Sequence, residues 1–250
     1  MRIVILGSGN VAFHLAQAFS ENKIGVSQIF GRNGKALKEI SERCNIPYST
    51  DEMMDADLYI IAVKDDVTAE ISRKIIKEDC LVAHTSGSLP KEILEGNYRK
   101  SSFYPLQTFS KSKKLNYAEI PFFVEAENQE DQEILKNLAS QVSENVMDSD
   151  YEKRKYIHLT AVFACNFVNH LFARAKEISD AQQIPFSYFL PLIDETVQKI
   201  YEIDPKSAQT GPAVRNDERV LQLHEDLITS KEHLKIYKTM NDSIKKMYEL

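Results

Sequence analysis

The 250-residue chain has little cysteine and no long apolar run. Its three cysteines, Cys44, Cys80 and Cys165, are far apart and form no CxxC or Cys/His ligand pattern, so neither a disulfide framework nor a zinc site is indicated. The clearest apolar run of the first half, Leu58 to Val63, is much shorter than the roughly 18 residues of a membrane span. The apolar start of the chain is too short for a signal peptide. We therefore expect a cytoplasmic protein without a metal site or a membrane segment.

An excess of positive charge is also missing. The chain has 31 Lys and Arg against 37 Asp and Glu, a formal net charge of −6, which disfavours nucleic acid as a partner. One local basic cluster, Lys111, Lys113 and Lys114, is interpreted as a solvated loop rather than a phosphate site. Hydrophobic residues make up 43% of the chain, which is typical of a folded protein with one large domain or two modest ones.

Two kinds of pattern divide the chain. In the first half, short apolar runs alternate with polar, helix-compatible stretches, which is typical of a parallel sheet with crossover helices. This alternation predicts an α/β N-terminal Rossmann domain with a parallel, doubly wound sheet over residues 1–150. The predicted strands cover 2–6, 26–30, 58–63, 80–84 and 120–125, and the predicted helices cover 10–21, 34–44, 67–77 and 89–95.

The second part of the chain has helical patterns only. Residues 151–182 form one long predicted helix whose middle, Leu159 to Phe172, is apolar on nearly every face, so other helices must surround it. We expect an all-α C-terminal domain over residues 151–250. Its further helices are predicted over 186–202, 212–229 and 231–248.

The most informative motif follows the first predicted strand. Residues 7–12 have the pattern GxGxxA between a strand and a helix: Gly7 permits a tight turn, Gly9 lets the backbone approach a pyrophosphate, and Ala12 allows close packing. The helix N-terminus presents free N–H groups to phosphates. The motif predicts dinucleotide binding rather than a glycine turn without a ligand. The predicted contacts are Gly7, Ser8, Gly9, Asn10 and Val11.

The end of the second predicted strand bears on the choice of dinucleotide. An NAD site needs an Asp or Glu near this point for the ribose 2′-hydroxyl, whereas this strand is followed by Gly31, Arg32 and Asn33. The guanidinium of Arg32 and the amide of Asn33 favour a 2′-phosphate instead. The sequence therefore predicts NADP as the cofactor. The alternative is a surface turn whose arginine points into water.

Two later strand ends fall at the same predicted edge of the sheet, where open α/β sheets place their ligands. Val63 and Lys64 follow one strand, and His84 and Ser86 lie at the end of the next. We expect these residues to approach the ribose or the nicotinamide. An equally weighted alternative makes His84 a satisfied turn histidine and leaves Ser86 to cap the following helix.

Several segments, taken in order, resemble a known superfamily. Beyond the glycine motif and the strand end at Ala62 to Lys64, they are His84 to Pro90, Tyr104 to Phe109 and Gly211 to Asp217. The chain is similar to the superfamily of pyrroline-5-carboxylate reductase, 6-phosphogluconate dehydrogenase and deazaflavin-dependent NADP reductase. Within it, the chain resembles an uncharacterised Rossmann-like family with a helical C-terminal domain of unknown function. The resemblance implies an NADP-dependent oxidoreductase of a small molecule and a homodimer formed through the helical domain.

The chain departs from the family pattern at two positions. Tyr104 stands where the family usually has a histidine before Pro105, so a histidine proton role there is not implied. The hydroxyacid dehydrogenases of the superfamily place a catalytic lysine four residues before an asparagine. If Asn166 matches that asparagine, the lysine position is Val162. Dehydrogenation by that lysine mechanism is therefore disfavoured.

Polar residues on the long predicted helix offer another proton donor. At about 100° per residue, His158, Asn166 and Asn169 share one face, and buried polar groups there must find partners. One interpretation is an interdomain or dimer hydrogen-bond network. The other makes His158 the general acid, with Asn166 beside it, and keeps Tyr104 as a further catalytic candidate.

A last candidate lies in the first turns of the helix predicted from residue 212. Arg215 is suited to clamp a substrate carboxylate, or alternatively to pair with Asp217. The leading prediction is an NADP-dependent oxidoreductase that passes hydride between the nicotinamide and a small carbonyl, imine or flavin-like substrate. The competing prediction is a non-catalytic NADP-binding redox sensor or partner-binding module, because the superfamily lysine is missing and Tyr104 replaces histidine.

Overall fold

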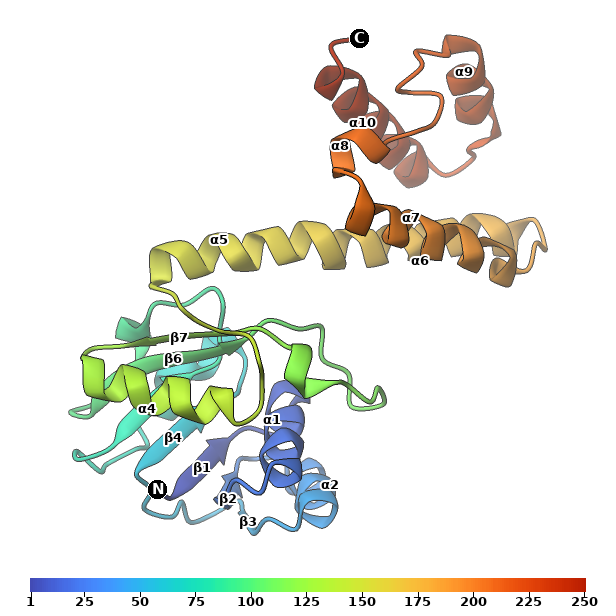
Figure 1. Ribbon diagram of the computed structural model, residues 1–250. Helices are drawn as coiled ribbons and strands as arrows, with labels where there is room; N and C mark the ends of the chain where they lie inside the picture. The colour runs from blue at the N-terminus through green and yellow to red at the C-terminus, as the bar shows by residue number, and fades with distance from the viewer. The chain divides into compact units, whose positions relative to one another are not determined.

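The computed structural model describes residues 1–250, which form two compact units, Met1–Asn166 and Phe167–Leu250 (Figure 1). All strands lie in the first unit, and the second unit is helical. The predicted domain boundary near residue 150 stays a prediction. It follows the last strand, whereas the compact units divide at the end of a helical segment that begins at Tyr151.

The first unit is built on one eight-stranded sheet of order β3-β2-β1-β4-β5-β6-β7-β8. All neighbours from β3 to β6 pair in parallel, β7 is antiparallel to β6, and β8 is parallel to β7. The predicted Rossmann fold is confirmed, with one antiparallel pair added near the edge of the sheet. The strands are β1 (Ile3–Leu6), β2 (Val26–Phe30), β3 (Tyr48–Ser49), β4 (Leu58–Ile61), β5 (Leu81–His84), β6 (Arg99–Pro105), β7 (Phe122–Ala126) and β8 (Val146–Asp148).

The helices of this unit are of unequal length. The first two have the bounds that the sequence predicts, whereas the helix predicted over 67–77 is shorter and the one predicted over 89–95 is a single 3-10 turn, because Leu94 is already extended. The helices are α1 (Asn10–Glu21), α2 (Gly34–Cys44), α3 (Thr68–Ser72), α4 (Gln129–Ser140) and α5 (Tyr151–Ala161), and the 3-10 turns are η1 (Asp65–Val67), η2 (Lys91–Ile93) and η3 (Tyr117–Glu119).

The sheet buries both of its faces. On β1, Ile3 and Ile5 belong to the core cluster that includes α1, α2 and α4, whereas Val4 and Leu6 belong to a second cluster with Ile71 of α3. This alternation follows from the two-residue period of a strand. Each fully buried Ile or Leu contributes about 1.5–3 kcal/mol to stability. All members of the two clusters belong to this unit, so it forms its core from its own residues.

The segment predicted as one helix over 151–182 contains α5, a π-helical turn η4 (Val162–Phe167) and α6 (Val168–Ala181). The helix predicted from residue 212 begins only at Glu218, because Asn216 has a positive φ of 50° and the Asp217 side chain caps the first turn. The remaining elements are η5 (Phe186–Phe189), α7 (Leu190–Glu202), α8 (Pro205–Ala208), α9 (Glu218–Leu227) and α10 (Lys231–Met247).

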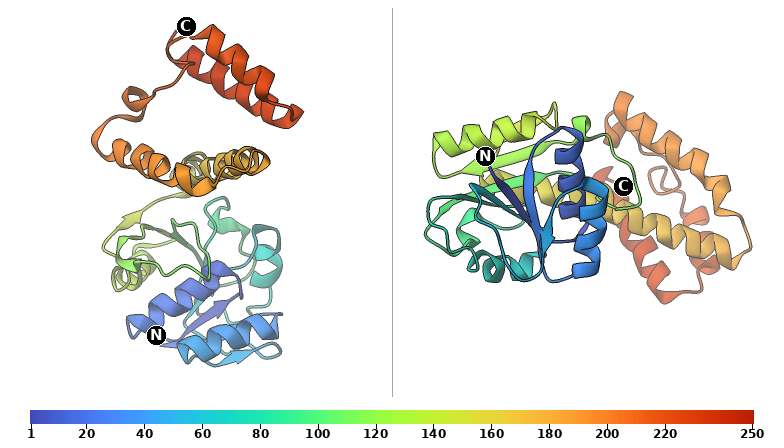
Figure 2. Two further views of the ribbon diagram at one scale, coloured as in Figure 1. Left: turned by 90° about the vertical axis from the view of Figure 1, so that its right-hand side faces the viewer. Right: turned by 90° about the horizontal axis from the view of Figure 1, so that it is seen from below.

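Ion pairs link the helices of the second unit. Helices α9 and α10 lie side by side and antiparallel (Figure 2), joined by Glu218 to Lys245 and by Glu225 to Lys238 at 2.9 Å. Arg174 of α6 pairs with Glu232 of α10 at 2.8 Å. No helix in the structure combines the length and the hydrophobicity needed to cross a bilayer.

Residues 159–172, which the sequence predicts to be surrounded by other helices, are exposed or half-buried. Leu159 is 50% exposed, Phe163 64% and Phe167 50%. The apolar pattern that predicted burial is present, but these side chains keep exposed surface.

Candidate functional site

The glycine motif lies where the direction of the chain along the sheet reverses. β1 pairs with β2 on one side and with β4 on the other, and the helices that follow β1 and β4 belong to the clusters on opposite faces. In open α/β sheets, ligands bind beside the carboxyl ends of the strands at such a switch point. The candidate site is therefore built from the ends of β1, β2, β4, β5 and β6.

Gly7 makes the turn that leaves β1. Its φ is +134°, and an added Cβ would lie 2.1 Å from the carbonyl oxygen of Ala62, directly after β4. Its N–H donates to the carbonyl of Phe30 at 2.8 Å. Both the backbone conformation and the lack of space require glycine here.

Gly9 is the N-cap of α1, and its surroundings suit a phosphate group. An added Cβ would meet no atom within 4 Å. No side chain caps the helix, and no acidic residue lies in its first turn. The first N–H groups therefore have no protein partner, and they lie at the positive end of the helix dipole. Ala12, one turn later, is fully buried against the sheet. These residues fit the pyrophosphate of a dinucleotide.

The turn after β2 presents one cation. Arg32 is exposed and makes no hydrogen bond or ion pair, so its guanidinium is available to an anion. The Asn33 side-chain oxygen caps α2 by accepting from the Ala36 N–H at 3.1 Å, which leaves the amide N–H groups as donors. The pair fits a ribose 2′-phosphate, with Arg32 supplying the charge.

Of the two predicted contacts after β4, Val63 is half-buried and Lys64 is exposed to solvent. Val63 packs beside the Gly7 turn, since its Cγ1 would lie 3.4 Å from an added Cβ. Lys64 is exposed and forms no ion pair. Ser86, after β5, accepts a hydrogen bond from the Ser88 N–H at 3.0 Å. Of these side chains, Lys64 has the most freedom to reach a ligand.

His84 lies away from any ligand surface. Its side chain is completely buried, and Nδ1 accepts a hydrogen bond from the Ser86 N–H at 3.1 Å, as a turn histidine would. Nε2 is buried without a hydrogen-bond partner. Burial, followed by the nearby charge of Arg154, lowers the pKa of His84 to about 3. These contacts support the alternative of a satisfied turn histidine, because a side chain without exposed surface has none to offer a ligand.

Tyr104 and His158 meet although they are far apart in the chain. The Tyr104 hydroxyl lies 3.0 Å from His158 Nδ1, and the rings pack edge to face with centroids 6.1 Å apart. Burial raises the pKa of Tyr104 to about 12, so this hydroxyl keeps its proton at neutral pH. The structure thus brings together two of the three residues that the sequence singled out for catalysis.

Gly87 allows this approach, and sequence reasoning gave it no role. An added Cβ would lie 2.7 Å from Tyr104 Cζ and 2.8 Å from His158 Cβ. The only signal in the sequence was a glycine in a turn directly after a predicted strand. The need for glycine at a point where two side chains lie close to the backbone is seen in the coordinates and not in the residue spacing.

Arg154 anchors the helix that carries His158. Its side chain is fully buried: Nη1 donates to Glu125 of β7 at 2.5 Å, and Nη2 donates to the Leu89 carbonyl at 2.8 Å. Lys91 donates to the other oxygen of Glu125 at 2.7 Å. Because His158 lies one helical turn after Arg154, this buried pair fixes its position. No local pattern in the sequence indicates this network, because its members lie on separate elements.

Asn166 and Asn169 are exposed rather than buried. Asn166 lies in the π-helical turn, where the spacing differs from 100° per residue, so the face predicted to include His158 does not continue through it. Arg215 is also exposed and makes no ion pair with Asp217, whose carboxylate caps α9 by accepting from the Val220 N–H. Arg215 precedes α9 instead of lying within its first turns.

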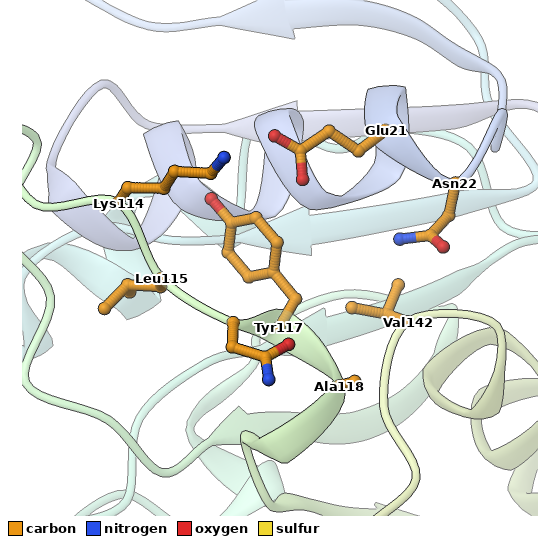
Figure 3. Close-up of a pocket in the computed structure, with 8 residues that line it drawn as sticks. Glu21, Asn22, Lys114, Leu115, Tyr117, Ala118 and Val142 are labelled. Atoms are coloured by element: carbon orange, nitrogen blue, oxygen red, sulfur yellow. The ribbon is translucent and has the colours of Figure 1, made fainter.

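The cavity shown in Figure 3 lies elsewhere in the first unit, beside the C-terminal end of α1. Its volume is about 590 Å³. Lys114 and Tyr117 come from the segment after β6 and face Glu21 of α1 across it. None of the predicted catalytic, cofactor-binding or substrate-binding residues lines this cavity, so it is separate from the candidate site. In the structure, no group of three or more His, Cys, Asp or Glu side chains is placed to hold a metal ion.

Two family models match different parts of the chain. Residues 2–87 match a family described as NADP oxidoreductase, coenzyme F420-dependent. Residues 120–244, half of the chain, match a domain of unknown function, DUF2520. A search of the curated proteins finds no match.

Solved structures match over the whole length. A "putative NADP oxidoreductase" from Bacteroides fragilis is 40% identical, with a TM-score of 0.94 over 100% of this chain and 98% of that one. A protein from Thermotoga maritima is 20% identical, with a TM-score of 0.74 over 99% and 98%. Pyrroline carboxylate reductase from Plasmodium falciparum, with NADP bound, is 15% identical, with a TM-score of 0.57 over 100% and 94%. The last two show likeness of fold alone.

Proposed function

The chain belongs to the family that joins an NADP oxidoreductase domain to a DUF2520 domain, and from this premise we propose that it transfers hydride between NADP(H) and a small carbonyl, imine or flavin-like substrate. The observation that carries the proposal is the uncapped N-terminus of α1 at Gly9, directly after the turn that only glycine can make at Gly7. The description of the matched N-terminal family, with its coenzyme F420, supports a flavin-like substrate among the three classes.

NADP is proposed over NAD because of the turn after β2. Arg32 has no protein partner and no carboxylate follows the strand directly, so the cation is free to bind a 2′-phosphate. Gly7, Ser8, Gly9, Asn10 and Val11 are proposed to line the pyrophosphate, with Asn33, Val63, Lys64 and Ser86 nearer the riboses. The bound nicotinamide supplies or accepts the hydride.

The pair formed by His158 and Tyr104 is proposed to handle the proton. His158 Nδ1 is engaged by the Tyr104 hydroxyl at 3.0 Å, which leaves Nε2 as the nitrogen available to a substrate. A hydroxyl both donates and accepts, so Tyr104 can bond to the imidazole in its neutral and its protonated forms. The raised pKa of Tyr104 makes it a positioning residue and leaves His158 as the general acid.

Two further exposed residues are proposed to contact the substrate. Asn166 is exposed near the end of the first unit and is proposed to orient the substrate. The guanidinium of Arg215 is exposed and unpaired, and it is proposed to bind a substrate carboxylate if the substrate is an acid.

A homodimer is proposed for the helical part of the chain. Large apolar side chains stay exposed on α7, including Leu192 at 64%, Ile200 at 53% and Tyr201 at 79%. Large exposed apolar side chains in this number are typical of subunit interfaces. In the proposed homodimer, the same helix of a second copy would cover these side chains.

A turnover assay separates the enzyme from the binding protein. We expect NADPH to be consumed with at least one member of a panel of imines, keto acids, aldehydes and flavins. We expect His158→Gln to lower turnover about a hundredfold while the melting temperature and the NADPH affinity stay unchanged. Tyr104→Phe should lower turnover less and shift its pH profile, because it removes only the partner of Nδ1.

Two results would count against this assignment. NADPH that binds tightly but is never oxidised with any substrate would favour the redox sensor. Normal turnover by His158→Gln would show that the proton comes from another group, with Tyr104 or water as the next candidates.

A further inference from the structure

A loop after β6 is fastened to the first turns of the candidate cofactor helix. The loop runs from Leu106 to Asn116, between β6 and η3. The side-chain amide of Asn10, the first residue of α1, donates to the Phe109 carbonyl at 2.8 Å. One turn later, His14 contacts the Ser110 carbonyl through Nε2 at 2.9 Å. The loop is therefore bound to the helix whose N-terminus would hold the pyrophosphate.

His14 is the centre of this attachment. Its side chain is only 2% exposed, and its ring lies against Phe109 with centroids 5.1 Å apart. Because a carbonyl oxygen only accepts, Nε2 must donate to Ser110. In the neutral ring Nδ1 then accepts from the Tyr117 hydroxyl, 2.8 Å away. One imidazole thus bonds to the loop at Ser110 and to the residue that directly follows its last position, Tyr117.

A second set of contacts holds the middle of the loop. The ammonium of Lys111 pairs with Glu39 of α2 at 2.9 Å and lies 5.5 Å from the centre of the Phe13 ring. The segment between β6 and Phe109 is left with exposed polar side chains: the Gln107 oxygen accepts from the Thr108 N–H at 2.7 Å, which leaves the Gln107 amide N–H groups as donors. These donors follow the carboxyl end of β6, at the edge of the sheet where the candidate site lies.

We propose that His14 is a positioning residue that holds the loop Leu106–Asn116 on α1 and couples the order of this loop to dinucleotide binding. The coupling rests on the proposed function, because it requires that a dinucleotide occupies the N-terminus of α1. A ligand that orders the first turn of α1 also orders the loop that Asn10 and His14 hold there. Linkage is reciprocal: the factor by which the dinucleotide stabilises the ordered loop equals the factor by which the ordered loop strengthens dinucleotide binding. Loss of the attachment must therefore weaken cofactor binding.

The test combines hydrogen exchange with cofactor titration. His14→Ala removes both hydrogen bonds of the ring and its packing against Phe109, and Tyr117→Phe removes only the hydroxyl that meets Nδ1. Tyr98→Phe is the matched control, because the Tyr98 hydroxyl is also buried and also makes one hydrogen bond, to the Ser72 carbonyl at 3.1 Å, away from the loop. Amide exchange is measured across the first unit with and without NADPH.

In His14→Ala, we expect exchange of the backbone amides of 107–116 to rise at least tenfold without cofactor, while the amides of β1 and β4 change little. NADPH should bind about tenfold more weakly and should no longer protect the loop. Tyr117→Phe should show the same pattern at a smaller size, and Tyr98→Phe should leave the loop and the affinity unchanged.

The proposal is overturned if exchange rises equally across the sheet, because His14 would then be an ordinary core residue. It is also overturned if the loop loosens while NADPH affinity is unchanged. If the wild-type protein does not bind NADPH at all, the proposed function fails and the coupling with it, whereas the fastening of the loop is decided by the exchange rates without cofactor.

Discussion

The two compact units of this chain differ in how fully they bury their large apolar side chains. In the sheet unit, Phe13 and Leu15 of α1 are at most 2% exposed. In the helical unit, Leu192 of α7 is 64% exposed and Leu227 of α9 69%. The sheet is therefore covered by residues of its own unit, whereas the helical unit has large apolar side chains that are exposed, as is typical of surfaces that bind another subunit.

The largest effect is expected from breaking the self-contained unit at its glycine turn. Gly7→Val places a β-branched side chain at a φ of +134°, where its Cβ would lie 2.1 Å from the Ala62 carbonyl oxygen. We expect a loss of more than about 3 kcal/mol in the free energy of unfolding, because strain and steric overlap add. Urea unfolding followed by circular dichroism measures it.

Gly9→Val is the matched control for this turn. Its Cβ has open space within 4 Å, so the fold should stay intact while NADPH binding is lost, since the side chain occupies the place of the phosphate. A stable Gly7→Val variant, or a Gly9→Val variant that still binds NADPH, would contradict the assignment of the motif.

Ion pairs sharpen the comparison between the units. Arg154 in the sheet unit is fully buried against Glu125, whereas Arg174 in the helical unit pairs with Glu177 and Glu232, which are more than half exposed. We expect Arg154→Ala to cost about 3 kcal/mol, because it leaves a carboxylate in a buried place with one partner fewer. Arg174→Ala should cost less than about 1 kcal/mol. Equal losses in the two variants would remove the distinction.

The exposed apolar side chains of α7 predict an interface on the helical unit. Leu192→Glu should weaken the dimer at least a hundredfold, about 2.7 kcal/mol, because it buries a charge in the interface. Ile76→Glu is the matched control: Ile76 is 89% exposed but lies in the sheet unit, and its replacement should leave the dimer intact. Sedimentation velocity over a range of concentrations decides it. A monomeric wild-type protein would refute the homodimer.

Burial of His84 makes the stability of the sheet unit dependent on pH. The pKa of His84 falls from 6.5 to about 3 on burial, so the unfolded chain takes up a proton that the folded chain refuses. Its stabilising contribution is complete above pH 6.5 and is lost as the pH falls toward 3. Between pH 6.5 and 4.5 we expect a loss of about 2 kcal/mol from this residue.

His84→Asn tests this assignment, because an asparagine oxygen can accept the Ser86 N–H but does not titrate. We expect its stability to fall less steeply between pH 6.5 and 4.5 than that of the wild type. Parallel pH profiles for the two proteins would show that His84 is not the titrating group.

The first half of the sheet unit was predictable because its signals are local. The glycine motif and regular apolar spacing gave α1 and α2 at their observed bounds. β6 was missed because Ser101 and Ser102 interrupt its apolar pattern, although both are buried; the Ser101 hydroxyl bonds to the Val82 carbonyl across the strand pair. A buried serine whose hydroxyl bonds to a neighbouring strand cannot be recognised as buried from the sequence pattern alone.

The candidate site was predictable only where single residues carry the signal. Gly7, Gly9 and Arg32 follow strand ends, and topology brings strand ends together. The contact between Tyr104 and His158 joins segments 54 positions apart, and no spacing rule connects them. Burial of Asn166 was wrongly expected because its apolar neighbours suggested a buried core, whereas these neighbours are exposed.

The central claim is that the glycine turn and Arg32 together select NADP, and a fluorescence titration of NADPH and NADH tests it most directly. A charge-assisted hydrogen bond contributes about 1.5–3 kcal/mol, so NADPH should bind at least tenfold more tightly than NADH. Arg32→Ala should remove most of this difference while leaving NADH affinity unchanged. Equal affinity of the wild-type protein for both dinucleotides, or an undiminished preference in Arg32→Ala, would contradict the account.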